Sequence, residues 1–227
     1  MNDFRGLGLF LGFLAVPLAF VVMSERAAST RMGEAIDAAS EVPIASAAED
    51  EYCTPQLKQV VRRVASACGL LETGARGCKP ADAKAVAALT GDDFNALFKP
   101  LSNRAHIVQF DEDQVHLDDG AMAEVEEVWG EKRGASFFFV VSRASTDGGA
   151  EHNAELSQER AKAVLSHLEG KFPQDDDLKK VGLLWLGEEF AQLGPEFCTW
   201  QRSRDGDQCA TPEINRSAFV AWIDCAI

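Results

Sequence analysis

The stretch that decides the fold runs from Phe137 to Leu168 and reads FFFVVSRASTDGGAEHNAELSQERAKAVLSHL. Its opening residues, Phe137 to Val141, form a continuous apolar run, which is typical of a strand buried on both faces. A polar, glycine-containing turn over residues 142–151 follows, and Asn153 then has the character of a helix N-cap. The apolar residues that come after it fall on one helical stripe: Leu156, Ala161, Val164, Leu165 and Leu168. This order of strand, loop and helix gathers ligand-binding groups beside a helix N-terminus.

Three further apolar runs, over residues 106–110, 181–186 and 218–225, predict strands on either side of this stretch, whose own strand covers 136–141. Between the first two strands, Asp118 or Asp119 caps a predicted helix whose apolar residues reach Trp129 on one face. The resulting order, β-α-β-α-β-β, predicts an α/β fold, an α+β sandwich with a mixed sheet and two helices packed on one face.

These residues also resemble a family. The motif N-x-x-L-S-x-x-R-A, the central signature of the OmpA-like C-terminal domain, is spelled by Asn153, Leu156, Ser157, Arg160 and Ala161. Supporting marks stand in the same order as in that family: Phe110-Asp111, Gly187-Glu188 and Asn215-Arg216. The resemblance covers residues 105–227, about half the chain, so we expect an OmpA-like domain over 104–227. The family binds peptidoglycan, which the resemblance implies as the ligand.

The resemblance also implies which residues recognise the ligand, the diaminopimelate of the peptide stem. An arginine fork suits a carboxylate and an acid suits the nearby amine. Arg160 matches the family arginine, although an arginine here could instead hold loop carbonyls. The family acid stands eight residues before Asn153, where this chain has Ser145; the nearest acid is Asp147, two positions later. Either Asp147 meets the amine in a shortened loop, or the ammonium partner is missing. Arg216 resembles an arginine of the closing motif and either holds the loop or touches ligand.

Asn153 is interpreted as a helix cap more than as a ligand contact, and His152 as exposed loop packing. The formal net charge of −14 and the lack of a basic stripe argue against a nucleic-acid partner. No hydrolase, metalloprotease or phosphate-loop motif occurs, so neither enzymatic activity nor a cofactor is expected. The cysteines and histidines lack zinc-ligand spacing, and the acidic run 175–177 lacks the spacing of a calcium loop, so no metal is expected.

Residues Gly6 to Met23 contain no charge and as a helix would extend roughly 27 Å, close to the thickness of a bilayer core. We interpret residues 1–23 as an uncleaved membrane anchor, with a cleaved signal peptide as the alternative. Residues 24–50 are rich in Ala, Ser and Glu and are expected to be a flexible tether. The expected location is the inner membrane, crossed once.

Six cysteines follow the apolar run, at positions 53, 68, 78, 198, 209 and 225. An even number after a membrane segment favours disulfides in an oxidising compartment, the periplasm, over buried free thiols. Residues 51–103 are expected to form a small helical unit. Its first helix would separate Cys53 from Cys68 by roughly 20 Å, too far for a bond. Cys68 with Cys78 across the following loop, and therefore Cys53 with Cys225, is the working hypothesis. Cys198 and Cys209 can close a polar loop, and the resemblance supports that pair.

The sequence therefore predicts a non-enzymatic, membrane-anchored envelope protein of a Gram-negative bacterium that holds peptidoglycan non-covalently. The alternative is a protein–protein scaffold with a degenerate ligand site, which would bind another envelope protein through residues 51–103.

Overall fold

The computed structural model describes residues 52–70, 81–82, 90–132, 134–204, 206 and 209–225. The predicted anchor at Gly6 to Met23, the tether, the second helix of the helical unit and Cys78 lie outside these residues. Within the described ranges, no helix combines the length and apolar character needed to cross a membrane.

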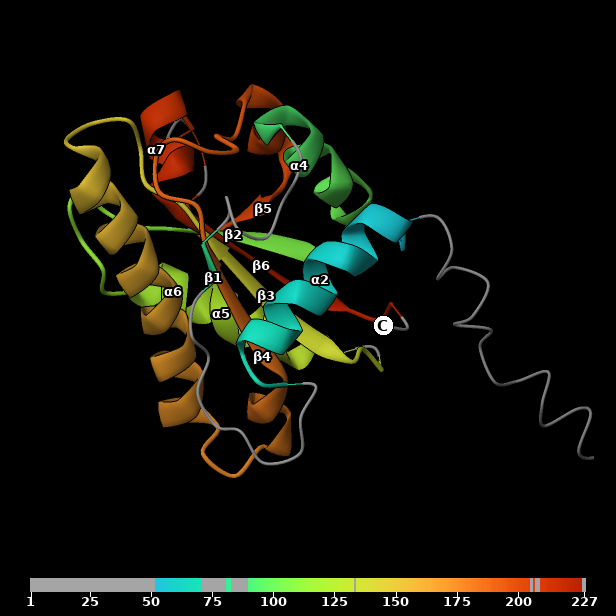
Figure 1. Ribbon diagram of the computed structural model, residues 1–227. Coiled ribbons are helices and arrows are strands. Elements are labelled where there is room, and N and C mark those ends of the chain that lie inside the picture. Colours follow the sequence, from blue (N-terminus) through green and yellow to red (C-terminus); the bar gives the residue numbers. More distant parts are fainter. Residues whose placement is uncertain are drawn as a thin grey trace, which may run out of the picture. The chain divides into compact units, whose positions relative to one another are not determined.

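One mixed sheet organises this part of the chain (Figure 1). The four predicted strands are present within a residue or two of their expected bounds: β2 (Ala105–Gln109), β3 (Phe137–Ser142), β4 (Val181–Trp185) and β6 (Ser217–Ile223). Two short edge strands, β1 (Ala81–Asp82) and β5 (Gln201–Arg202), complete the order β1-β4-β3-β6-β2-β5. β3 and β4 are parallel, and β6 lies antiparallel between β3 and β2.

Two helices cover one face of the sheet, as the sequence predicts. They are α5 (Asp119–Gly130), capped by the Asp118 side chain, and α6 (Ala150–Lys171). Their apolar stripes meet the sheet in one buried cluster that includes Val125, Val164 and Val220. Trp129 and Trp222 fill its lower part, and Trp222 Nε1 donates to the carbonyl oxygen of Val128 at 2.8 Å, which satisfies the indole in the core.

The opposite face of the sheet is covered by the described part of the helical segment (Figure 1). α2 (Pro55–Ala67) begins at the predicted Thr54 cap, and α4 (Gly91–Phe98) leads into the 3-10 helix η1 (Lys99–Leu101). Leu57 of α2 and Phe98 of α4 share one buried cluster with Phe139 and Phe219 of the sheet. The helices therefore have no core of their own, which differs from the separate unit that the sequence suggested. A sheet with two apolar faces needs a cover on both sides.

Two disulfides tie distant and local parts of this structure together. Cys53 is joined to Cys225, which links the start of α2 to the residues just after β6. Cys198 is joined to Cys209 and closes the loop that contains β5. Both pairs are those expected above, whereas the pair of Cys68 with Cys78 involves a residue outside the described ranges.

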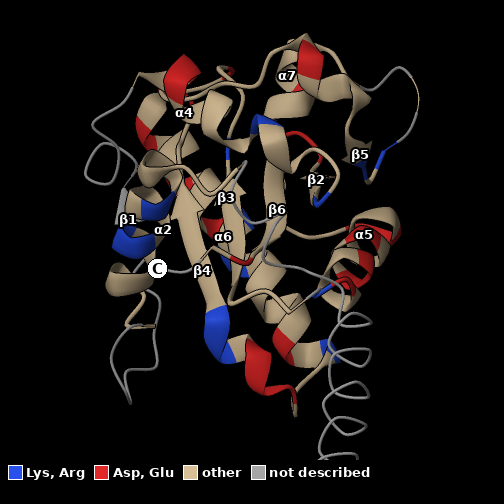
Figure 2. Ribbon diagram, turned by 90° about the vertical axis from the view of Figure 1, so that its right-hand side faces the viewer, with Lys and Arg blue, Asp and Glu red and all other residues tan. Residues whose placement is uncertain are grey.

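The remaining elements are short, and the charged residues are unevenly spread. They are the 3-10 helices η2 (Asp176–Lys180) and η3 (Pro195–Thr199) and the one-turn helix α7 (Thr211–Asn215). In Figure 2 acidic residues mark α5, whereas α2 carries basic ones.

The start of α6 differs from the prediction. The helix begins at Ala150 with Gly149 as its N-cap, so Asn153 lies inside the first turn and does not cap the helix. Its side chain is drawn into contacts with the neighbouring loops, described below, which outweigh its local preference for a capping position.

Candidate functional site

The predicted site residues gather at one edge of the sheet. β2 and β3 both end there, followed by the loops 110–118 and 143–149, and β4 ends there before the Gly187 turn. Because β6 is antiparallel to β2 and β3, its amino end lies at the same edge, and Arg216 directly precedes it. Four segments that are distant in sequence therefore meet beside the N-terminus of α6.

A cavity of about 280 Å³ lies among these segments. All five residues singled out from the sequence line it: Ser145, Asp147, Asn153, Arg160 and Arg216. Glu112, Asp113, Gly148, His152 and Leu156 complete the wall. Two arginines and three acids thus face one small space, an arrangement that suits a ligand with charges of both signs.

Arg160 forms the buried end of this cavity and is committed to the backbone. The residue has no measurable exposure, and its Nε, Nη1 and Nη2 donate to the carbonyl oxygens of Gln114, Arg143 and Asp111 at 2.9, 3.1 and 3.0 Å. Its guanidinium carbon lies 5.1 Å from the centroid of the Phe110 ring, a cation–π contact. Arg160 therefore pins the two ligand-side loops together, the carbonyl-holding role that the sequence left open.

The charge of Arg160 is costly in this position. Burial lowers its pKa to about 10, the nearby charge of Arg216 acts in the same direction, and Asp113 opposes both. The side chain is still cationic at neutral pH, so two positive charges lie close together at this edge of the sheet.

Arg216 occupies the more open side of the cavity. Its side chain is 17% exposed, and Nη2 lies 3.1 Å from Asp147 Oδ2 and 3.2 Å from Glu112 Oε2. Nε makes a long contact of 3.4 Å with Ser145 Oγ. Asp147 is therefore in the cavity as the shortened-loop reading requires, but its carboxylate is paired with Arg216.

Asn153 fixes the loop that carries Asp147. The side chain is buried, and Nδ2 donates to the Asp147 carbonyl oxygen at 2.9 Å and to the Glu188 carboxylate. Gly148 makes the turn between them with φ +103°, a conformation that glycine adopts without strain. The amide thus clamps the β3–α6 loop to the turn after β4.

The motif residues near Asn153 serve the attachment of α6 to the sheet. Leu156, Ser157 and Ala161 are buried, and Ser157 Oγ accepts the Gly187 N–H at 3.1 Å. Ser142 Oγ at the end of β3 donates to the Ser157 carbonyl oxygen at 2.5 Å. The helix is therefore held to both neighbouring strands, and this fixes where the Arg160 stem starts.

Three cavity residues were not predicted as site residues. Glu112 and Asp113 follow Phe110-Asp111 in the loop after β2, so their position at a strand's carboxyl end was the available signal. His152 was interpreted as loop packing; its Nε2 lies 2.6 Å from Asp113 Oδ1, and both side chains are more than half exposed. This contact spans the cavity mouth between the β2–α5 loop and the first turn of α6.

Arg143, next to the site, points away from it. It is fully buried on the side of α4, where its Nε donates to the Ala191 carbonyl oxygen at 2.8 Å and Nη2 to Asn95 Oδ1 at 3.1 Å. Burial lowers the pKa of Arg143 to about 9. Its own carbonyl accepts from Arg160, so the loop is held from the cavity side and from the helical segment at once.

A second cavity of about 610 Å³ adjoins the first and shares Glu112 and Arg216 with it. Gln109, Phe110, Asp111, Gln114, His116, Arg204 and Glu213 form the rest of its lining. Arg204 lies 2.8 Å from Asp111 and 2.7 Å from Asp118, so it anchors both ends of the β2–α5 loop.

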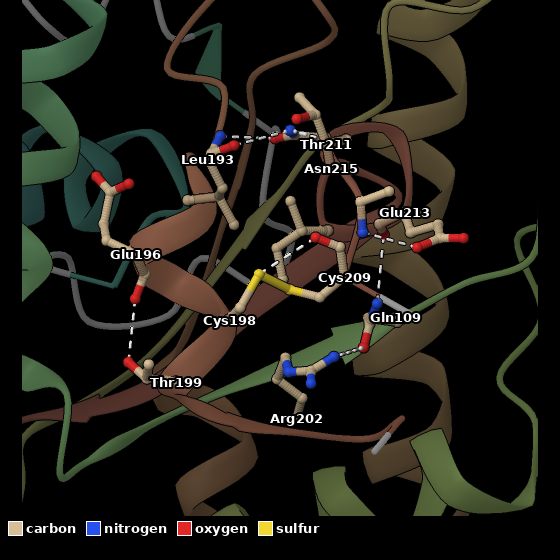
Figure 3. Close-up of a disulfide and its surroundings, with 12 residues drawn as sticks. Gln109, Leu193, Glu196, Cys198, Thr199, Arg202, Cys209, Thr211, Glu213 and Asn215 are labelled. Carbon is tan, nitrogen blue, oxygen red and sulfur yellow. Dashed lines mark hydrogen bonds between the residues drawn. A yellow bond between two sulfur atoms is a disulfide. The ribbon is translucent and has the colours of Figure 1, made fainter. Parts of the chain in front are cut away.

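The loop closed by Cys198 and Cys209 supports this edge from outside (Figure 3). Asn215 of the closing motif is buried, accepts the Leu193 N–H at 2.7 Å and donates to the Leu193 and Thr211 carbonyl oxygens. The asparagine therefore holds α7 against the preceding loop and sets the position from which Arg216 projects.

Comparisons with known proteins give fold-level likenesses alone. No family model matches this sequence, and no curated protein matches it. Among solved structures, the chain is similar to the peptidoglycan-associated lipoprotein from Burkholderia pseudomallei, with 24% identity and a TM-score of 0.39 over 54% of this chain and 92% of that one. It is similar to the OmpA-like domain of FopA1 from Francisella tularensis subsp. tularensis SCHU S4, with 16% identity and a TM-score of 0.37 over 53% and 74%.

A MotB-like protein from Desulfovibrio vulgaris shows 16% identity and a TM-score of 0.30 over 50% of this chain and 68% of that one. These TM-scores are low, and the functional proposal that follows rests on the cavity.

Proposed function

We propose that residues 104–227 act as an OmpA-like domain that binds peptidoglycan non-covalently and without catalysis. The observation that carries the proposal is the cavity of about 280 Å³, which the five residues chosen from the sequence line together. Its ligand is the free end of diaminopimelate in the peptide stem, which bears an ammonium and a carboxylate on one carbon.

The size and charge of the cavity support this ligand. At ~30 Å³ per water molecule, the space corresponds to roughly nine waters, enough for the end of one amino acid. The acids Glu112, Asp113 and Asp147 suit the ammonium, with Asp147 as the principal partner. The guanidinium groups of Arg160 and Arg216 suit the carboxylate, and Asn153 and Ser145 shape the loop between them.

A binding role is favoured over an enzymatic one by how the polar groups are used. In the described cavity, Ser145 Oγ contacts an arginine and not an imidazole, and His152 is directed to Asp113. An activated nucleophile needs a base within hydrogen-bond reach.

The location forms part of the proposal. Two disulfides support an oxidising compartment, for which the periplasm of a Gram-negative bacterium is the natural choice. The apolar run from Gly6 to Met23 would anchor the chain once in the inner membrane, and residues 24–50 would give the domain reach toward the wall.

A protein scaffold is the second candidate, and one observation favours it: Arg160 donates to three carbonyls, as expected of a ligand site that has lost its function. Against it, the large apolar side chain found exposed in the described residues is Val115, which lies outside the helical segment. Within that segment α2 and α4 turn their apolar residues to the sheet.

Co-sedimentation with purified diaminopimelate-type peptidoglycan tests the proposal, using the full chain in a mild non-ionic detergent. Asp147→Asn should weaken binding by at least about tenfold, the worth of a charged hydrogen bond. Asp176→Asn is the matched control, because that carboxylate is exposed and pairs with Lys179 at the far end of β4. A folded wild-type chain that stays in the supernatant would favour the scaffold.

A further inference from the structure

The two arginines of the cavity are not equally available to a ligand. Arg160 has no measurable exposure, and each of its three nitrogens already donates to a loop carbonyl. A carboxylate that recruited Arg160 would have to draw it away from these carbonyls and leave buried acceptors without donors. It would also loosen both loops that form the cavity.

Arg216 has the opposite character. Its guanidinium is partly exposed, and its partners at Nη2 are the carboxylates of Asp147 and Glu112, which are 54% and 72% exposed. Exposed carboxylates can rotate into water at little cost, because the ion pairs that they leave are weak. Arg216 can therefore change partners while the backbone of the site stays as it is.

The Arg216–Asp147 pair has the same two charges as the proposed ligand. A diaminopimelate end offers a carboxylate in place of that of Asp147 and an ammonium in place of the guanidinium. If both pairs exchange, the ligand carboxylate lies on Arg216 and the ligand ammonium on Asp147. Every charge is still paired after the exchange, so the desolvation that opposes burial of single charges is avoided.

Resting on the function proposed above, we propose that Arg216 is the residue that selects the ligand carboxylate, and that the ligand enters by exchange with the Arg216–Asp147 ion pair. Arg160 is then a positioning residue that holds the loops. The proximity of its charge to Arg216, which contributes to its lowered pKa, adds to the demand of Arg216 for an anion.

The exchange gives the site a defined specificity. A stem with a free diaminopimelate carboxylate completes both new pairs. A stem amidated at that carboxylate, or one with lysine in its place, keeps the ammonium but brings no anion. Opening the internal pair for such a ligand leaves Arg216 without a counter-charge, so binding should be disfavoured.

The experiment measures affinity by calorimetry for three synthetic tripeptide stems, which end in free diaminopimelate, amidated diaminopimelate and lysine. The full chain is compared with Arg216→Gln and Arg216→Lys. Arg104→Gln is the matched control, because it removes an arginine paired with Asp224 at 2.6 Å at the opposite end of β2. Thermal unfolding and circular dichroism establish that each variant is folded.

Wild type and Arg104→Gln should prefer the free stem by at least about tenfold. Arg216→Gln should lose this preference and bind the three stems alike, whereas Arg216→Lys should keep the preference at lower affinity, because lysine retains the charge and lacks the fork. A folded Arg216→Gln that still prefers the free stem overturns the exchange and leaves the proposed function standing. Failure of wild type to bind any stem overturns both.

Discussion

The two described disulfides should differ in their worth to stability, and the difference can be calculated from chain length. Cys53 and Cys225 are 172 residues apart, whereas Cys198 and Cys209 are 11 apart. We consider two double variants, Cys53→Ala with Cys225→Ala and Cys198→Ala with Cys209→Ala. Each removes one cross-link and leaves the other.

In the chain-entropy treatment, a cross-link stabilises by restricting the unfolded chain, and the effect grows with the logarithm of the closed loop. For these separations it gives ~5 kcal/mol for the long loop and ~3 kcal/mol for the short one. Measured effects are often smaller than this treatment gives, so the difference of ~2 kcal/mol is the firmer expectation.

The native contacts act in the same direction. Cys53 and Cys225 are both buried, so alanine leaves unfilled space at this position. Beside the disulfide, Arg104 Nη1 donates to the Tyr52 hydroxyl at 2.9 Å and pairs with Asp224 at 2.6 Å. Loss of the covalent link allows this end of α2 to separate from β6, and that adds to the entropic loss.

Urea unfolding at pH 7, followed by circular dichroism, gives the free energy of unfolding and the slope with urea for the three proteins. The long-loop variant should unfold at the lowest urea concentration and show the larger rise in slope, because its unfolded chain exposes more surface. Equal or greater destabilisation by the short-loop variant would refute the reasoning and assign the main stability of the fold to the loop around β5.

Three further outcomes follow from the structure. Lys132→Met should lower the free energy of unfolding by ~1 kcal/mol at pH 7, because Lys132 lies 2.5 and 2.8 Å from Asp175 and Asp177 and holds both of their pKa values below the ordinary one. That contribution is present above about pH 4 and is lost as the pH falls through the lowered values, so urea unfolding at about pH 2 to 3 should find variant and wild type alike. Arg143 has a pKa of about 9 in the folded state, below its value in the unfolded chain, so above pH 9 the unfolded state binds the extra proton. The stability of wild type relative to Arg143→Gln should therefore rise between about pH 9 and 10.5, by up to ~1.4 kcal/mol per pH unit, and a flat difference would contradict it. Asn153→Ala should cost ~1–3 kcal/mol in thermal unfolding and also weaken peptidoglycan co-sedimentation, since the loop loses its clamp; stability without any loss of binding would show that the clamp does not shape the site.

The strands could be predicted because their sequences allow little else. Phe137–Val141 and the run that became Ser217–Ile223 are apolar throughout, and the structure buries every residue of β6. The place of β6 between β2 and β3 could not be predicted, since sequence order says nothing of an antiparallel insertion. The edge strands of two residues, Ala81–Asp82 and Gln201–Arg202, are too short to form a pattern.

The start of α6 shows where local preference fails. Asn153 has a capping side chain, and the sequence before it contains two glycines, so a helix beginning after it was the natural expectation. In the structure its amide is worth more elsewhere, because the Asp147 carbonyl and the Glu188 carboxylate both need a donor. Gly149 then accepts the capping position without a side-chain bond. A tertiary contact across 35 residues therefore decided a local boundary.

The same limit separates the types of residue at the site from their roles. An arginine at position 160 suits a carboxylate, but whether it meets one depends on which acceptors are nearer, and three carbonyls are. The motif residues Leu156, Ser157, Arg160 and Ala161 are all buried against the sheet or the loops. They therefore specify the architecture of the cavity first.

The groups that a ligand can reach, Glu112, Asp147 and Arg216, lie outside that motif. A chain can accordingly carry the full signature and still differ in what it binds. Discrimination among stem chemistries must be decided by the exposed ion pair, and that is why the Arg216 variants, more than those of Arg160, separate a peptidoglycan-binding domain from a scaffold that keeps only the fold.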